Sequence, residues 1–159
     1  MNKNLSALLG EHNFLLGLPP AHLEVITGCA SNVKFDAGET LFREGDEAHQ
    51  FYLVRHGRVA LDIFAPGRGP ITIQTVGEGE VVGWSWLVAP YHWRFTARAV
   101  ELTRAVALDG RCLREKCERD HSLAYELLKR LADVVSQRLD ATRLQLLDVY
   151  AATAPTGKR

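Results

Sequence analysis

The sequence predicts a mainly β protein with flanking helices: an antiparallel β jelly roll (double-stranded β-helix) with a short N-terminal helix and a long C-terminal helix. Apolar and polar residues alternate through residues 31–109, and glycine-bearing turns interrupt them at intervals of about ten residues, which is typical of short strands in a sandwich or jelly roll. From residue 111 to 150 the apolar residues recur at steps of three and four, without glycine or proline. This change of period predicts helix.

The predicted elements divide the chain into four segments. Residues 1–30 form an N-terminal helical brace, in which Pro19 and Pro20 begin a small helix. Residues 31–110 form the jelly-roll core, which we expect to bind a ligand, and residues 111–150 form the C-terminal helices. Residues 151–159 are small and polar, and we expect a disordered tail. A length of 159 residues, 47% of them hydrophobic, fits one domain with an appendage.

The C-terminal segment predicts one long amphipathic helix from about residue 121 to 150, capped by Asp120 or Ser122. At about 1.5 Å per residue it would be about 45 Å long, which is more than one small β domain covers. An approximate seven-residue repeat favours homodimerisation through this helix. Its members are Leu128, Leu131, Val135, Arg138, Thr142, Gln145 and Val149. The alternative is that the helix folds back on its own sheet.

Composition excludes several classes of partner. Nineteen basic and nineteen acidic residues give a formal net charge of zero, so the chain has no overall field that attracts nucleic acid or an anionic membrane. No apolar run approaches the roughly 20 residues that span a bilayer, and the N-terminus lacks a signal-peptide pattern. We therefore expect a cytoplasmic protein without membrane or direct DNA contacts.

The residues also argue against catalytic and metal sites. The six histidines are scattered singly, without the closely spaced pair of a metal-binding jelly roll, and no activated serine or cysteine nucleophile is recognisable. We expect no catalytic residues, no metal and no enzymatic activity. The odd number of cysteines, Cys29, Cys112 and Cys117, predicts reduced thiols rather than a disulfide framework, with redox sensing as a weaker alternative.

The segment Gly79–Leu87 predicts a strand that breaks at Gly83 into a single helical turn, and Arg94 follows at a distance that allows it to return beside that turn. Backbone N–H groups at the start of a helix have no partner within it, so such a turn with a nearby arginine is suited to one phosphate or carboxylate. We therefore predict a site for a small anionic ligand. Its candidate residues are Val82, Gly83, Trp84, Ser85, Trp86, Arg94, Phe95 and Thr96.

The order of these elements, together with the segments Phe35–Asp46 and Phe51–Val59, resembles the cyclic nucleotide-binding domain of catabolite activator proteins and protein kinase A regulatory subunits. The resemblance covers about residues 12–150 and implies a cyclic nucleotide ligand, cAMP or cGMP, held without a covalent bond. In that family a glutamate after the turn glycine binds the ribose hydroxyl, and a downstream arginine pairs with the cyclic phosphate. Some bacterial members contact the base from the long helix, at the place where Thr142 stands.

The chain departs from this family pattern at two positions. Trp84 follows Gly83 where the family has glutamate. Arg94 lies eleven residues after Gly83, as the family arginine does, but counting back from the strand at 96–99 puts Trp93 in that place. Either Arg94 still points inward, or it is displaced and the pocket is rebuilt around Trp84, Trp86 and Trp93.

Two functional hypotheses follow. The first is a stand-alone, non-enzymatic sensor or regulatory module that binds a cyclic nucleotide or another phosphate-bearing small molecule. Because no helix-turn-helix follows the long helix, it would signal through that helix to a separate, unidentified protein effector. The alternative is a degenerate domain whose pocket is filled by its own tryptophans and which acts as a protein-interaction subunit. An enzyme is a distant third option, and haem held by His92 is a separate, weaker alternative.

Overall fold

The computed structural model describes residues 2–153, and the chain divides into two compact units, Met1–Ala124 and Tyr125–Arg159. The first unit opens with α1 (Asn2–Glu11), the short 3-10 helix η1 (Asn13–Leu15) and α2 (Pro20–Thr27). Helix α2 has a proline in its first turn, where a backbone N–H would have no acceptor within the helix, so the lack of an N–H in proline costs nothing. The predicted small helix at the prolines is therefore present, whereas α1 was not expected.

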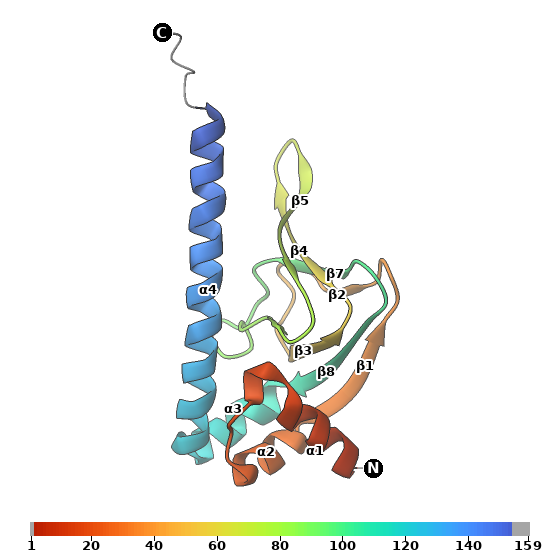
Figure 1. Ribbon diagram of the computed structural model, residues 1–159, viewed down its shortest axis with the longest axis vertical. Coiled ribbons are helices and arrows are strands. Elements are labelled where there is room, and N and C mark those ends of the chain that lie inside the picture. Colours follow the sequence, from red (N-terminus) through yellow and green to blue (C-terminus); the bar gives the residue numbers. More distant parts are fainter. Residues whose placement is uncertain (1, 154–159) are drawn as a thin grey trace. The chain divides into compact units, whose positions relative to one another are not determined.

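Two four-stranded antiparallel sheets follow and confirm the predicted jelly roll (Figure 1). One sheet has the strand order β1-β8-β3-β6 and the other β2-β7-β4-β5. Strands β4 and β5 form a hairpin that extends beyond the other strands in Figure 1. The strand bounds are β1 (Ala30–Phe35), β2 (Thr40–Phe42), β3 (Gln50–His56), β4 (Val59–Ala65), β5 (Gly69–Val76), β6 (Val81–Val82), β7 (Thr96–Ala99) and β8 (Thr103–Asp109).

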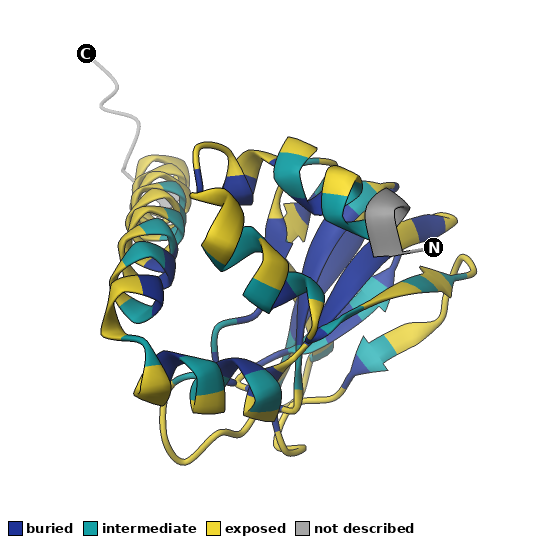
Figure 2. Cartoon of the chain, turned by 90° about the horizontal axis from the view of Figure 1, so that it is seen from below, coloured by how far each residue is buried: buried dark blue, intermediate teal, exposed yellow. Residues whose placement is uncertain are grey.

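The core lies between the sheets. The side chains at every second position of the strands point inward and fill it. Figure 2 shows the central strands mostly in the dark blue of buried residues. In β7, Ala97 and Ala99 are buried, while Thr96 and Arg98, which alternate with them, are only partly buried. Alternation of this kind assigns each residue of a strand to one face of the sheet.

Helix α3 (Gly110–Arg119) follows β8 directly and is capped by Asp109, whose carboxylate accepts a hydrogen bond from the Cys112 N–H at 2.9 Å. Cys112 forms a disulfide with Cys29, and the two Cα atoms are 5.7 Å apart. The prediction of reduced cysteines is therefore wrong for this pair. The pairing of β1 with β8 brings the two cysteines together although 83 positions separate them, and Cys117 is free and buried.

Helix α4 (His121–Thr153) confirms the predicted long helix. Its cap is Asp120, whose carboxylate accepts hydrogen bonds from the N–H groups of Ser122 and Leu123 at 3.1 and 3.2 Å. Residues 151–153 are helical, so the prediction of a disordered tail is wrong there, and residues 154–159 lie outside the described part of the chain. Among the described helices, none combines the length and apolar character needed to cross a membrane.

The part of α4 in the second unit carries a regular stripe of small and apolar residues at alternating steps of four and three. All of its members are exposed: Leu128, Ala132, Val135, Leu139, Thr142, Leu146 and Val149. The predicted repeat instead included Leu131, which is only 4% exposed, and Arg138, which is partly buried. The exposed stripe, called the α4 seam below, therefore differs from the predicted one.

Candidate functional site

The predicted anion-binding segment begins where β6 ends. Gly83 follows Val82 with a φ of +88°, a conformation that glycine adopts without strain. The chain then makes one tight turn, closed by a hydrogen bond from the Leu87 N–H to the Trp84 carbonyl at 3.1 Å. The expected helical turn is thus reduced to a single hydrogen-bonded turn.

The ring of Trp93 lies against Gly83. A Cβ atom added to Gly83 would come within 2.3 Å of the Trp93 ring, so the two residues are packed as closely as a glycine allows. The indole also stacks on Phe42, with ring centroids 3.6 Å apart and 9° between the ring planes. Trp93 is 4% exposed and belongs to the core between the sheets. The space in front of the turn glycine is therefore filled by a side chain of the protein.

The alternation that runs into β7 explains this arrangement. Trp93, Phe95 and Ala97 are buried, whereas Arg94 is exposed and Thr96 is only partly buried. Residues of one parity point into the core and those of the other parity point away from it. The residue count back from β7 had placed Trp93 at the arginine position, and the structure agrees with that count.

Neither arginine of this segment supplies a charge to the interior. Arg94 makes no hydrogen bond or ion pair with the part of the chain that the structure describes. Arg98 pairs with Asp62, its Nε lying 3.3 Å from the carboxylate. Asp62 is 6% exposed and also accepts a hydrogen bond from the Thr72 hydroxyl at 2.6 Å, so the Arg98 charge is committed to this network.

The other predicted residues fall in different places. Val82 and Phe95 lie in the core with Trp93. Thr96 accepts a hydrogen bond from the Glu44 N–H at 3.0 Å, Ser85 is buried and Trp84 is partly buried. Thr142 belongs to the second unit, and its hydroxyl donates to the Arg138 carbonyl at 2.9 Å.

Trp86 is a structural residue of the core. It is fully buried, its ring lies 5.5 Å from that of Phe51, and Gly110 packs on its Cβ. Its carbonyl accepts a hydrogen bond from Arg114 of α3, whose guanidinium also lies 4.3 Å from the centre of the Tyr91 ring. Sequence reasoning missed Arg114, because nothing in the sequence relates α3 to this turn.

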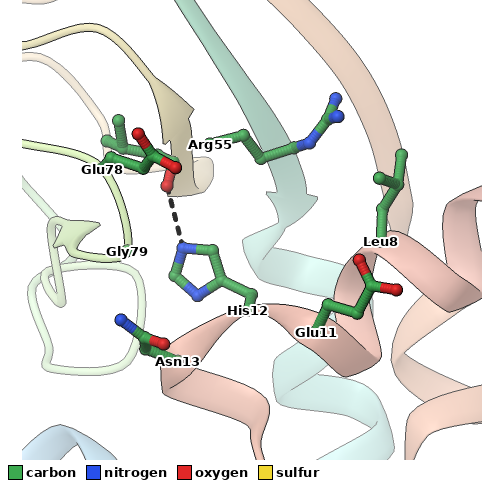
Figure 3. A pocket seen from close by; sticks show the side chains of 8 residues that line it. Leu8, Glu11, His12, Asn13, Arg55, Glu78 and Gly79 are labelled. Atoms are coloured by element: carbon green, nitrogen blue, oxygen red, sulfur yellow. Dashed lines mark hydrogen bonds between the residues drawn. The ribbon is translucent and has the colours of Figure 1, made fainter.

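Sequence reasoning also missed a pocket of about 540 Å³ between the N-terminal helices and the turn before β6 (Figure 3). Its lining residues are Leu8, Glu11, His12, Asn13, Val54, Arg55, Glu78 and Gly79. His12 is 7% exposed, and its Nδ1 accepts from the Phe14 N–H at 3.2 Å, so Nε2 carries the proton that it donates to the Val54 carbonyl at 2.9 Å. Nε2 therefore holds the brace to β3, Nδ1 caps η1 within the brace, and neither nitrogen is available to a ligand.

Burial lowers the pKa of His12 from its ordinary value, and the hydrogen bond to Val54 acts in the opposite direction as the smaller effect. His12 is therefore neutral at pH 7. Within the described residues, no group of three or more histidine, cysteine, aspartate or glutamate side chains could hold a metal ion.

The residues around Gly83 do not fit a cyclic phosphate in this arrangement. The aromatic ring of Trp93 occupies the face of the turn, and Arg94, the predicted phosphate partner, is exposed. A buried phosphate needs a positive partner and aligned N–H groups, because an unpaired charge is costly to bury. The sequence left open an inward Arg94 or a pocket rebuilt around Trp84, Trp86 and Trp93. The exposure of Arg94 and the contact of Trp93 with Gly83 favour the second.

Comparison with known proteins connects this fold to a family. The sequence profile of the cyclic nucleotide-binding domain matches residues 32–120. Over 151 residues the chain is 23% identical to a CRP-like cAMP-activated global transcriptional regulator of Mycobacterium tuberculosis. That match covers 95% of this chain and 66% of the relative, so the chain spans just under two thirds of the relative's length.

Two solved structures are also similar. The catabolite activator protein of Thermus thermophilus is 26% identical with a TM-score of 0.67, and the match covers 87% of this chain and 63% of that one. A cyclic nucleotide-binding domain from Methylobacillus flagellatus has a TM-score of 0.79 and covers 99% of this chain and 87% of its own. At 19% identity, that second likeness concerns the fold alone.

Proposed function

Because the chain belongs to the cyclic nucleotide-binding domain family, we propose that it is a non-enzymatic regulatory module whose nucleotide site is closed by Trp93. In this proposal the module acts by binding protein chains, and no cyclic nucleotide is required. The observation that carries the proposal is the Trp93 ring packed on Gly83 and stacked on Phe42.

Energetics support a closed site. A nucleotide that used this turn would first have to displace Trp93 from the core, and removing a buried tryptophan from a core costs about 3–5 kcal/mol. Such a penalty lowers affinity by about two to four orders of magnitude. Trp84 stands where the family has glutamate. Its presence would weaken binding further, because a ribose hydroxyl would lose its acceptor.

The proposed output is association through α4. The α4 seam repeats at steps of four and three, which is the spacing of residues that meet in a two-stranded coiled coil. We propose a homodimer formed by two such helices, with a separate protein effector as the downstream partner. A cytoplasmic location remains part of the proposal.

Calorimetric titration with cAMP and cGMP tests the closed site. We expect no saturable heat with the unaltered chain. In the double variant Trp84→Glu with Trp93→Arg, the two residues that the family uses stand at the positions that the resemblance and the residue count from β7 indicate, and saturable binding should appear. Circular dichroism establishes that the variant is folded.

The cyclic nucleotide sensor hypothesis makes the opposite prediction. It requires saturable binding to the unaltered chain and loss of that binding in Arg94→Ala. That pair of results would replace the closed-site proposal, and Trp93 would then have to leave the core when the nucleotide binds.

A further inference from the structure

The disulfide between Cys29 and Cys112 lies just beyond the end of the β1–β8 pairing, where Ala30 stands opposite Leu108. Cys29 follows the end of α2, and Cys112 lies in the first turn of α3. We propose that this disulfide is a thiol-reversible modification site, a clamp that small thiols open and small disulfides close, and that its state controls how firmly α3 is held. The inference does not depend on the proposed function.

Helix α3 has a small buried surface of its own. Of its ten residues, only Gly110, Leu113 and Cys117 are buried, and the remainder are largely charged. Segments with few buried apolar contacts open locally at low free energy. A covalent link in the first turn therefore adds to the few contacts that hold this helix.

The non-covalent contacts of α3 lie at two places. At its start, the Gly110 N–H donates to the His49 carbonyl at 2.8 Å, and the Asp109 N–H donates to the Cys29 carbonyl at 2.9 Å. One turn later, Arg114 binds the Trp86 carbonyl and the Tyr91 ring. These contacts keep α3 folded on the unit when the disulfide is open, so reduction loosens the helix without releasing it.

Accessibility allows the exchange reaction. Cys29 is 6% exposed, whereas Cys112 is only partly buried, so we place the attack of an incoming thiolate at Cys112 rather than at Cys29. Its attack breaks the Cys29–Cys112 bond, forms a mixed disulfide on Cys112, and releases Cys29 as a thiolate that takes up a proton. A second small thiol then attacks the mixed disulfide and frees Cys112, and the two small thiols leave as one oxidised disulfide. Oxidised glutathione reverses the same steps.

Cys117 does not take part. It is 8% exposed and lies five residues after Cys112 on the same helix, a separation that places the two side chains on different faces. Burial also raises the pKa of its thiol, which keeps it in the unreactive protonated form. Cys117→Ser is therefore the matched control for a thiol on α3 outside the clamp.

The test compares the full chain after treatment with oxidised and with reduced glutathione. After the oxidised form, denatured protein should have one titratable thiol, Cys117, and after the reduced form all three. Hydrogen exchange followed by mass spectrometry should show amides of residues 110–119 exchanging about tenfold faster in the reduced protein, while β4 is unchanged. The Tm should fall by about 5–15 °C on reduction.

Two variants complete the test. The double variant Cys29→Ser with Cys112→Ser should behave like the reduced protein in either glutathione form, and Cys117→Ser should respond as the unaltered chain does. The proposal is overturned if three thiols remain after oxidised glutathione. It is also overturned if residues 110–119 exchange equally in both states, whatever the change in Tm.

Discussion

At the scale of single residues, the contact between Gly83 and Trp93 is the observation on which the closed-site proposal rests. The alternation of side chains in the residues before β7 determines which of them points inward. In this chain it is the indole of Trp93 rather than the guanidinium of Arg94. The family resemblance suggested an arginine from its spacing after Gly83. Counting from β7 gives the residue that is buried, because strand parity is fixed by backbone pairing and a loop can change its length.

Gly83→Ala tests this contact, with Gly38→Ala as the control. Both glycines have a φ near +90°, so both variants carry the same backbone strain, but only at Gly83 would the added methyl meet a neighbouring ring. We expect Gly83→Ala to be more destabilising by about 1–3 kcal/mol in urea unfolding. The difference should shrink in a Trp93→Leu background, and equal effects of the two glycine variants would contradict the packing.

His12 predicts a pH dependence of stability. Its pKa is lowered in the folded state, so the unfolded chain binds a proton more readily. The free energy of unfolding should therefore fall as pH drops below about 6.5, the ordinary pKa of histidine, until the lower folded-state pKa is passed. Protonation at Nδ1 would also remove the acceptor of the Phe14 N–H.

Urea unfolding between about pH 7.5 and pH 5.5 measures this effect. In His12→Gln the loss of stability across this range should be smaller than in the unaltered chain, although the variant is less stable at the upper pH. The control is His121→Gln, at an exposed histidine. A pH profile that is identical in the His12 variant would show that this residue does not contribute.

At the scale of elements, a single substitution removes the hydrogen bond that caps α3. Asp109→Ala leaves the Cys112 N–H without its side-chain acceptor and should cost about 1 kcal/mol. Asp109→Asn retains an acceptor and should cost less. Chemical unfolding measures the free energies, and a loss in Asp109→Asn as large as in Asp109→Ala would argue against capping as the cause.

Sequence patterns identified most elements because period two and period 3.6 reflect which face of each element is buried. The long helix and the alternating strands were predicted on that basis. The Cys29–Cys112 bond was not, because it depends on the register of β1 against β8, in which Ala30 stands opposite Leu108. The Arg114 contacts were missed because they too depend on the tertiary fold: they join α3 to a turn more than twenty residues earlier.

At the scale of the whole molecule, the α4 seam predicts self-association. Leu139→Glu places a charge in the centre of the seam and should weaken the homodimer by at least about a hundredfold, because a charge buried between apolar side chains has no partner. The matched control is Leu144→Glu, at a leucine that is 64% exposed and lies outside the seam. Sedimentation equilibrium measures both, and equal weakening by the two substitutions would exclude the seam as the interface.

The pairing of β1 with β8 has a consequence for the evolutionary mobility of the jelly roll. Because the first and last strands lie side by side from Ala30 opposite Leu108 to Phe35 opposite Thr103, the chain enters and leaves the sandwich at adjacent points. A domain with neighbouring entry and exit can be inserted into a surface loop of an unrelated host, or circularly permuted, without stretching either chain. The strand order therefore suits this sandwich to insertion into other proteins, because the start of β1 and the end of β8 lie side by side.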